Sequence, residues 1–420
     1  MNAIGHVWEE GFGAVYEGIV IVGGRRTPFG AFCKSLARIN PTDLGILAGR
    51  EVLKDSGVDP ACVDQVAFAS VAQSGADAYY LPRHIGLYCG VPKERPAVLL
   101  QRICGSGFET VIHAAEQIAL GKARIALAGG TESMSLNPTA AYGLRLGHDL
   151  GKPGFVDTLW ATLNDPACGC TMGETAENLA KLHGITREEV DRFAASSQEK
   201  YFLARERGFF DGELFPVRPG ALEGPAPLQP RKVAMHGGAE ELAQDEHPRR
   251  ATAEKLAKLP PVFGKGGVQT AGNSSGIVDG ACALVVASEE AARKQGLKPL
   301  GRLLASVTVG VSPEVMGIGP APAIRKLLAM TGTAAADVHS FEINEAFGAQ
   351  CLAVIKDLQL DPAKVNANGG AIAIGHPLAA SGARLTLTLL RHLSQSGGRM
   401  GVASACIGGG QGTALMVAPY

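Results

Sequence analysis

The feature that most constrains the fold is a pattern of strands and helices that occurs twice. In the first half, a helix that ends at Gly57 is followed by the segment VDPACVDQVAFAS, and in the second half a helix that ends at Gly332 is followed by TAAADVHSFEINE. When Val63 is aligned with Val338, the apolar positions of the two following strands coincide. A β-α-β order that recurs in this way indicates two similar repeats in a layered α/β fold.

A second helix supports the same alignment. It opens with a Ser-Gly pair in each half, at Ser106 and at Ser381. The differences 381 − 106 and 338 − 63 both equal 275, and this agreement weighs against chance similarity between generic β-α-β units. At 420 residues the chain also exceeds the roughly 250–300 residues at which one hydrophobic core stops growing. Two structural units on one plan are therefore expected.

Local patterns assign the individual elements of the first repeat. The apolar spacing from Thr42, a plausible cap, to Leu53 predicts an amphipathic helix, which Gly57 would end. The polar segment 73–83 is predicted to be a loop. Continuous apolar runs predict buried strands at residues 18–22, 66–71, 97–100 and 281–287.

The middle of the chain has a different character. From about residue 135 to 262, proline, glycine and charged residues increase, and helices are predicted without accompanying strands. Thr186 and Glu189 form a capping box ahead of one of these helices. An inserted lobe of this kind either covers an active site or is a structural excursion. We divide the chain into an N-terminal surface extension at 1–17, a first repeat at 18–134 and 262–291, a loop domain at 135–261, and a second repeat at 292–420.

Composition excludes several classes of protein. The 39 basic and 40 acidic residues nearly cancel, which argues against a chain built for nucleic acid or an anionic membrane. Nine scattered cysteines without a C-x-x-C pair indicate a reducing compartment, and Cys168 and Cys170 lack the further ligands of a zinc site. No apolar run approaches the ~20 residues needed to span a bilayer, and residues 1–17 do not resemble a signal or transit peptide. We expect a soluble, cytoplasmic protein.

Cys104 lies where a strand turns into a helix. Unpaired N–H groups and the positive end of the helix dipole favour an anion at such a turn, so the thiol is predisposed to be a thiolate. On this segment alone, a buried structural cysteine is an equally good interpretation, because free cysteine usually fills cores.

Three segments near the C-terminus carry further polar groups at turns. Asn344 and Glu345 follow a predicted strand, His376 stands between glycine and proline, and Cys406 precedes three glycines. A lone histidine beside proline is more often structural than catalytic. Two thiols, an imidazole and unshielded backbone amides in one pocket, however, would suit acyl transfer by a cysteine nucleophile.

These segments strongly resemble those of the thiolases, from about Gly18 to the C-terminus. Thiolases carry a nucleophilic cysteine in C-x-S-G, a GGxESM run, NEAF, GGAIAxGHPxGASGAR and CIGGGxG, and this chain matches them around Cys104, Met134, Asn344, His376 and Cys406. The resemblance implies a five-layer α-β-α-β-α sandwich made of two similar repeats plus an inserted loop domain. It also implies a dimer or tetramer of identical chains.

The resemblance further implies a reversible ping-pong Claisen reaction on coenzyme A thioesters. Cys104 would attack a 3-ketoacyl-CoA after His376 removes its proton, and acetyl-CoA would leave. Cys406 would protonate the departing enolate. The amides of Cys104 and Gly408 would hold one oxyanion, while His376 and a water on Asn344 would hold the other.

The resemblance also implies that coenzyme A is a substrate and that no cofactor is permanently bound. The chain departs from the family pattern at Ala379, where glycine is common, and at Val278, where asparagine or alanine is common, which leaves substrate preference open. The residues implied along the pantetheine arm and nucleotide are Met172, Ala271, Ser275, Ala346, Phe347 and Arg249.

The sequence is also compatible with other functions. A mainly biosynthetic enzyme that condenses two acetyl-CoA would use the same residues, and acyl chain length is open. A ketosynthase-like enzyme would commonly use histidines in place of Cys406. An inactive acyl-CoA or lipid carrier and a cysteine hydrolase are further alternatives from other classes.

Overall fold

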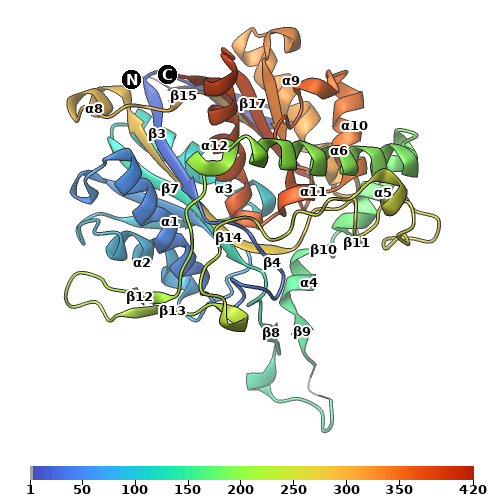
Figure 1. Cartoon of the computed structure of the whole chain (residues 1–420), viewed down its shortest axis with the longest axis horizontal. Helices are drawn as coiled ribbons and strands as arrows, with labels where there is room; N and C mark the ends of the chain where they lie inside the picture. Colours follow the sequence, from blue (N-terminus) through green and yellow to red (C-terminus); the bar gives the residue numbers. More distant parts are fainter. Residues whose placement is uncertain (1–2, 153) are drawn as a thin grey trace.

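A computed structural model describes residues 3–152 and 154–420 (Figure 1). Its centre is a mixed sheet of twelve strands, in which two groups of neighbouring strands can be distinguished. One group consists, in spatial order, of β6 (Ala97–Leu100), β5 (Gln65–Ala69), β7 (Ile125–Ser133), β14 (Val278–Ser288) and β3 (Ile19–Arg26). The other consists of β16 (Ser340–Ile343), β17 (Gly401–Ile407), β18 (Gln411–Pro419) and β15 (Gly301–Gly310).

The two groups of strands pair in the same way. In the first, β5 runs parallel to β7, and β7–β14 and β14–β3 are antiparallel. In the second, β16 runs parallel to β17, and β17–β18 and β18–β15 are antiparallel. The groups join where β3 pairs with β15 over only two residue pairs, Ile21 with Gly301 and Val20 with Arg302. The duplicated sequence pattern thus corresponds to a duplicated strand order.

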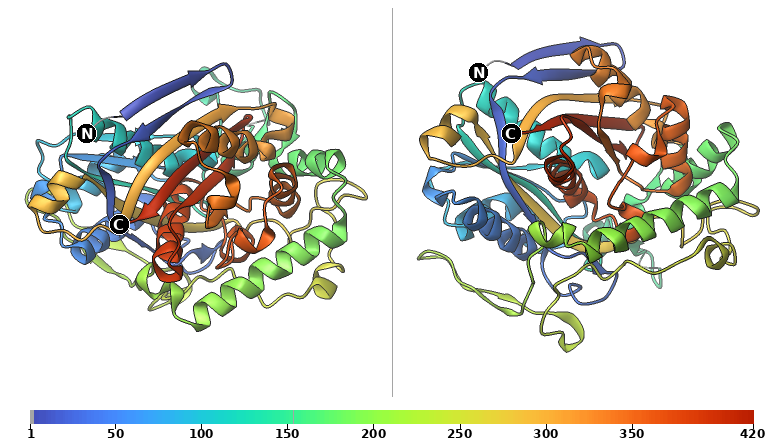
Figure 2. Two further views of the ribbon diagram at one scale, coloured as in Figure 1. Left: turned by 90° about the horizontal axis from the view of Figure 1, so that it is seen from above. Right: turned by 45° about the horizontal axis from the view of Figure 1, so that its top comes forward.

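Helices form three layers around these two groups of strands, and the two views in Figure 2 show them. The middle layer packs against both groups and contributes to one shared apolar core. This gives the expected α-β-α-β-α arrangement, because each sheet group must bury both of its faces. The outer layers are α1 (Pro41–Ser56) with α2 (Leu81–Tyr88), and α9 (Pro320–Thr331) with α10 (Gly348–Leu358); the middle layer is α3 (Ser106–Ala119) with α12 (Leu378–Ser396).

Helix α1 begins one residue earlier than its expected cap. The side chain of Asn40, and not that of Thr42, accepts the hydrogen bond from the first turn, and Pro41 occupies the first helical position. Gly57 ends the helix in the left-handed conformation, at φ 68°. The loop expected at residues 73–83 is too long: a 3₁₀ turn occupies Ala78–Tyr80, and helix α2 already begins at Leu81, where Pro82 is accommodated in the first turn.

Residues 3–16 form a β-hairpin, which the expectation of a surface extension did not include. Strand β1 (Ala3–Trp8) pairs with β2 (Gly11–Tyr16), and β2 pairs with β15. Gly11 and Gly13 allow this approach, because a Cβ atom at Gly11 would lie 2.2 Å from the carbonyl oxygen of Thr308. The hairpin therefore extends the second group of strands.

The segment between the repeats contains short strands as well as helices, whereas helices alone were expected. The capping box of Thr186 and Glu189 begins the long helix α6, as expected. The pair β8–β9 forms an arm that projects at the bottom of Figure 1. The helices are α4 (Thr158–Thr162), α5 (Met172–Leu182), α6 (Arg187–Glu206) and α7 (Ala253–Leu256), and the strand pairs are β8 (Thr139–Ala140) with β9 (Val156–Asp157), β10 (Asn164–Asp165) with β11 (Cys170–Thr171), and β12 (Gly220–Leu222) with β13 (Arg231–Val233).

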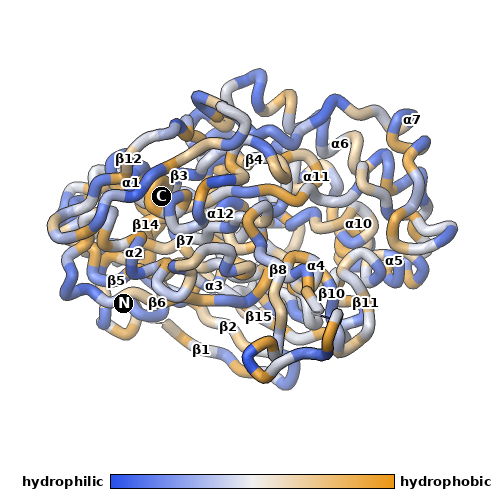
Figure 3. Tube along the Cα trace, turned by 90° about the horizontal axis from the view of Figure 1, so that it is seen from below, coloured by the Kyte–Doolittle hydropathy of each residue, from blue (hydrophilic) through white to orange (hydrophobic). Residues whose placement is uncertain are grey.

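Hydropathy follows the layers. Strands β7 and β14 are buried along their whole length. Hydrophilic segments gather at the margins of Figure 3, for example around α7. Within residues 3–152 and 154–420, no helix combines the length and the apolar character needed to cross a membrane. The remaining elements are β4 (Gly30–Ala31), α8 (Glu289–Lys294) and α11 (Ala371–Ile374).

Candidate active site

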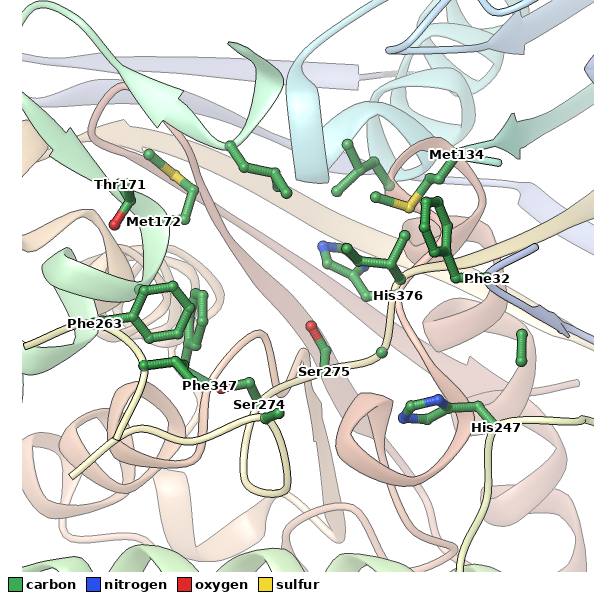
Figure 4. Close-up of a pocket in the computed structure, with 18 of the residues that line it drawn as sticks. Phe32, Met134, Thr171, Met172, His247, Phe263, Ser274, Ser275, Phe347 and His376 are labelled. Carbon is green, nitrogen blue, oxygen red and sulfur yellow. The ribbon is translucent and has the colours of Figure 1, made fainter. Parts of the chain in front are cut away.

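Two cavities lie beside the N-terminal ends of α3 and α12. The larger has a volume of about 550 Å³, and His376 lies in its middle, with Phe32 and Met134 on one side and Phe263 and Phe347 on the other (Figure 4). The smaller has a volume of about 270 Å³ and is lined by Ile103, Gly408 and Gly409 among others. Met172 lines both cavities, so they meet at its side chain.

Cys104 stands in a short 3₁₀ turn, Ile103–Gly105, directly before α3. Ile103 adopts a positive φ of 42°, which is a strained conformation for a β-branched residue. The thiol of Cys104 is buried and packs in a cluster with Met134 and Leu378, both of which line the larger cavity. Cys104 itself lines neither cavity, but it packs directly behind two residues of the wall of the larger one.

Burial controls the protonation of Cys104. It raises the pKa of the thiol to about 12, although hydrogen bonds from the backbone N–H groups of Gly408 and of Cys104 itself oppose the shift. The nearby carboxyl of Glu132 raises it further. The expectation of a thiolate at rest is therefore wrong: the loss of hydration outweighs the N–H groups, and the resting group is a thiol that needs a base.

His376 is held by two hydrogen-bonding groups. Its Nδ1 lies 2.5 Å from the hydroxyl of Ser381, whose oxygen also lies 3.2 Å from the carbonyl oxygen of Pro377, and its Nε2 lies 3.2 Å from Nδ2 of Asn344. The amide of Asn344 donates to Nε2, so Nδ1 carries the proton and donates it to Ser381, which donates in turn to Pro377. Nε2 thus keeps its lone pair.

Burial also keeps this imidazole neutral. Together with the positive charge of Arg384, it lowers the pKa of His376 to about 3. A neutral ring with an unprotonated Nε2 is able to accept a proton at any pH above that value. The pair of Cys104 and His376 is therefore a neutral thiol and a neutral base at rest.

Cys406 lies next to the end of β17 and is fully buried. It packs with Met172, Met316 and Ala346. Its pKa is raised well above its ordinary value, first by burial and then by the neighbouring Cys104. The structure thus brings together two thiols that are 302 positions apart along the chain.

The residues expected to bind substrate gather around the same space. Ala346 does not line the larger cavity, but its carbonyl oxygen accepts a hydrogen bond from the N–H of Ser275 at 3.0 Å. The others of this set all line the larger cavity: Met172, Arg249, Ala271, Ser275 and Phe347.

Three residues near the site were not assigned a role from sequence. The sequence identifies Ser381 only as a helix start, although its position five residues after a histidine is a usable signal. Glu132 is a carboxyl within a fully buried strand; it accepts hydrogen bonds from the N–H groups of Val71, Ala72 and Ala379, and burial raises its pKa to about 7. His247 lines the larger cavity, and nothing in its sequence context indicates this.

Metal ligands do not cluster in the part of the chain that the structure describes. No group of three or more His, Cys, Asp or Glu side chains suited to a metal ion occurs there. The polar groups that line the two cavities are backbone amides, hydroxyls, imidazoles and single charged side chains.

The chain is similar to known proteins over both of its halves. Residues 19–290 match the family model described as "Thiolase, N-terminal domain", and residues 297–419 match "Thiolase, C-terminal domain". The chain is 45% identical to the 3-ketoacyl-CoA thiolase, mitochondrial, of Bos taurus over 406 residues, 96% of this chain and 99% of that one. It is 41% identical to the acetyl-CoA acetyltransferase of Syntrophomonas wolfei over 404 residues, 95% and 98% of the two chains.

A solved structure extends the comparison to three dimensions. The human mitochondrial 3-ketoacyl-CoA thiolase in complex with CoA superimposes with a TM-score of 0.89, at 42% sequence identity, over 98% of each chain. Both halves of the chain match, and so does the fold as a whole. The chain belongs to the thiolase family.

Proposed function

We propose that this protein is an acyl-CoA:acetyl-CoA C-acyltransferase that cleaves 3-ketoacyl-CoA, including acetoacetyl-CoA, into acetyl-CoA and a shortened acyl-CoA. The observation that carries the proposal is that two neighbouring buried thiols, Cys104 and Cys406, lie near the cavity in which His376 presents a neutral imidazole with an unprotonated Nε2. Names of relatives, 3-ketoacyl-CoA thiolase and acetyl-CoA acetyltransferase, support the same reaction class.

In the first half-reaction, Cys104 is the nucleophile. His376 takes the proton of its thiol at Nε2, and the sulfur forms a bond to the 3-keto carbon of the substrate. The bond between the second and third carbons then breaks, and its electron pair forms the enolate of acetyl-CoA. Cys406 gives its proton to that enolate, acetyl-CoA leaves, and an acyl thioester remains on Cys104.

In the second half-reaction, free coenzyme A takes the acyl group. First, the protonated His376 gives a proton to the Cys406 thiolate, so both groups are neutral again. The coenzyme A thiol then loses its proton to Nε2 of His376, attacks the acyl carbon, and releases the Cys104 thiolate, which takes that proton from His376. Because the pKa values of both protein thiols are raised, each of them is a neutral thiol again at the end of a turnover.

Two separate groups of donors stabilise the oxyanions. The backbone N–H groups of Cys104 and Gly408 point at the nucleophilic sulfur, so they would hold the oxygen of the acyl thioester. His376 and Asn344 would hold the enolate oxygen of the acetyl unit. Among the residues that the structure describes, none is a hydrogen-bond partner of the carbonyl oxygen of the Asn344 side chain, which supports a bound water at this position.

Coenzyme A would enter through the larger cavity. Its apolar lining suits the pantetheine arm, and Arg249 lies on its wall as a cation for the phosphates of the nucleotide. No permanently bound cofactor is needed for this chemistry. Acyl chains longer than acetyl would extend from Cys104 toward the smaller cavity beside Gly408.

We further propose a homo-oligomer in a reducing compartment such as the cytoplasm. All nine cysteines are free thiols, which suits a reducing environment. The arm between β8 and β9 carries exposed apolar side chains, among them Leu146, Leu150 and Phe155, and such side chains support burial against a second copy. Light scattering of the purified protein would distinguish a dimer or tetramer from a monomer.

The test of the function is acylation by acetyl-CoA followed by mass measurement. We expect one acetyl group on Cys104, its transfer to added coenzyme A, and neither event in Cys104→Ser. A non-catalytic carrier would acquire no acetyl group, and a hydrolase would lose it to water without returning it to coenzyme A. Thiolysis rates with acetoacetyl-CoA and with longer 3-ketoacyl-CoA substrates would separate a degradative enzyme from a mainly biosynthetic acetyltransferase.

A further inference from the structure

Two cysteines that take no part in the proposed reaction occupy the turn of the β10–β11 hairpin. Asp165 pairs with Cys170 across the hairpin, and the N–H of Gly169 donates to the carbonyl oxygen of Asp165 at 2.9 Å. Gly169 has a φ of 68°, the left-handed conformation that lets the chain reverse between Cys168 and Cys170.

Both thiols lie against the backbone of this turn. The sulfur of Cys168 lies 3.9 Å from the carbonyl oxygen of Asp165, and the sulfur of Cys170 lies 3.7 Å from the carbonyl oxygen of Cys168. The pKa of Cys170 is raised, first by burial and then by the Cys168 thiol beside it. Both residues are half-buried, so small molecules in solution can reach them, unlike the buried Cys104.

The backbone allows a bond between these sulfurs. Residues two apart have Cα atoms at most about 7 Å apart in an extended chain and closer in a turn. Disulfides form when the Cα atoms are about 4.4–6.8 Å apart, a range that two residues on either side of a single turn residue can reach. Because no third metal ligand joins the two thiols among the described residues, a metal centre does not compete with this interpretation.

We propose that Cys168 and Cys170 form a reversible disulfide by exchange with a low-molecular-weight disulfide such as glutathione disulfide. One thiolate attacks a sulfur of glutathione disulfide and releases one glutathione, which leaves a mixed disulfide on the protein. The second thiol loses its proton, attacks the protein-side sulfur of that mixed disulfide, and releases a second glutathione. Two protein thiols are oxidised, and one glutathione disulfide is reduced to two thiols.

The position of the pair connects it to both cavities. Thr171 follows Cys170 directly, lines the larger cavity, and caps α5 through its hydroxyl and Glu174. Met172, the next residue, lines both cavities, and Asn164 on the opposite strand lines the smaller one. A bond across the turn fixes the hairpin that carries these residues, so oxidation is coupled to the shape of the substrate site.

The primary test is a peptide map of the whole protein after treatment with glutathione disulfide. The tryptic peptide that ends at Lys181 contains Cys168 and Cys170 and no other cysteine. We expect this peptide to lose about 2 Da, the mass of two hydrogen atoms, and to regain it with a reducing thiol. Cys33, an exposed cysteine with no cysteine near it in sequence, is the internal control and should carry a glutathione adduct instead.

Single variants define the pairing. Cys168→Ser and Cys170→Ser should each convert the internal disulfide into a stable glutathione adduct on the remaining cysteine. Stable adducts on both cysteines of the unchanged protein, with no loss of mass, would overturn the proposal. This map does not depend on the proposed function, so a failure of either can be recognised separately.

A second arm measures thiolysis, and it rests on the proposed function. In the oxidised protein, kcat/KM should decrease by at least about twofold. The decrease should stay below about 100-fold, the loss that a 1 Å displacement of the reacting groups produces. Activity should return on reduction. The double variant Cys168→Ser/Cys170→Ser should not lose activity under the same treatment, since neither residue contacts the substrate site. An equal loss of kcat/KM in the double variant would show that oxidation of another thiol lowers the activity. That result would contradict the coupling between this disulfide and the cavities.

Discussion

Replacement of Ser381 by alanine tests the assignment of His376 as the base. The hydroxyl of Ser381 is the partner of Nδ1 at 2.5 Å, and both residues are buried. In Ser381→Ala the N–H at Nδ1 loses its partner in a place that water does not reach. The ring can relieve this only by moving its proton to Nε2, where it can no longer accept a proton from Cys104.

The structure sets the size of the expected effect. A buried donor without a partner costs about 1–3 kcal/mol, and the rate falls about tenfold for each 1.36 kcal/mol, so kcat should decrease about 5- to 150-fold. KM for coenzyme A should change little, because Ser381 does not line the larger cavity. Ser381→Thr, which restores a hydroxyl, should recover part of the rate.

The assay is steady-state thiolysis of acetoacetyl-CoA, with thermal unfolding measured on the same samples. Thr386→Val is the matched control: Thr386 lies on the same buried helix, and its hydroxyl also donates to a backbone carbonyl, that of Gly382 at 2.9 Å, but it does not touch His376. Both variants should unfold at similarly lowered temperatures. If Ser381→Ala and Thr386→Val had the same kcat, the tautomer argument would be wrong.

Three further outcomes are expected. Cys406→Ala should still acquire an acetyl group on Cys104 from acetyl-CoA but should lose the condensation of two acetyl-CoA, as measured by mass and by acetoacetyl-CoA formation, because only the second step needs its proton exchange. The free energy of unfolding should decrease as the pH is lowered from 6.5 to 4. Burial lowers the pKa of His247 to about 4 in the folded protein, whereas the unfolded chain takes up that proton near pH 6.5. In urea unfolding, His247→Gln should show a smaller decrease over the same pH range. Gly382→Ala should destabilise the protein by about 1–3 kcal/mol in urea unfolding and lower kcat, since its Cβ would lie 2.2 Å from a backbone nitrogen of α3, whereas Gly220→Ala, in open space, should change neither.

Patterns of apolar residues predicted most of the architecture. The strands and the repeat offset follow from alternation of strands and helices, because each element must bury an apolar face. Strand β6, expected to be buried, is only half-buried because it lies at the end of the sheet. The hairpin at residues 3–16 was missed, since its strands contain exposed Ile4 and Val7 and are stabilised by pairing with the distant strand β15. Pairing with a strand some 290 residues away leaves no periodic signal in the hairpin itself.

The identity of the site residues was easier to predict than their chemical state. Short motifs with polar residues at strand ends located Cys104, His376 and Cys406. The protonation of Cys104 was not predicted correctly, because a helix start suggests a lowered pKa, and only the three-dimensional packing shows how completely the thiol is removed from water. Likewise, the sequence does not identify Ser381 as the hydrogen-bond partner of His376, because this contact depends on the side-chain rotamers in the first turn of α12.

The close approach of the two repeats explains why residues so far apart share one site. Gly107 and Gly382 are equivalent positions, 275 residues apart, and each lies against the other's helix: a Cβ atom at Gly107 would be 2.9 Å from the nitrogen of Gly382, and one at Gly382 would be 2.7 Å from the carbonyl carbon of Gly107. Such contacts require a local pseudo-twofold relation between α3 and α12. Any larger residue at this crossing would separate the helices. Cys104 and His376 both lie within six residues of it, each at the start of its helix, so the crossing that joins the repeats also brings the proposed nucleophile and the proposed base to the same region.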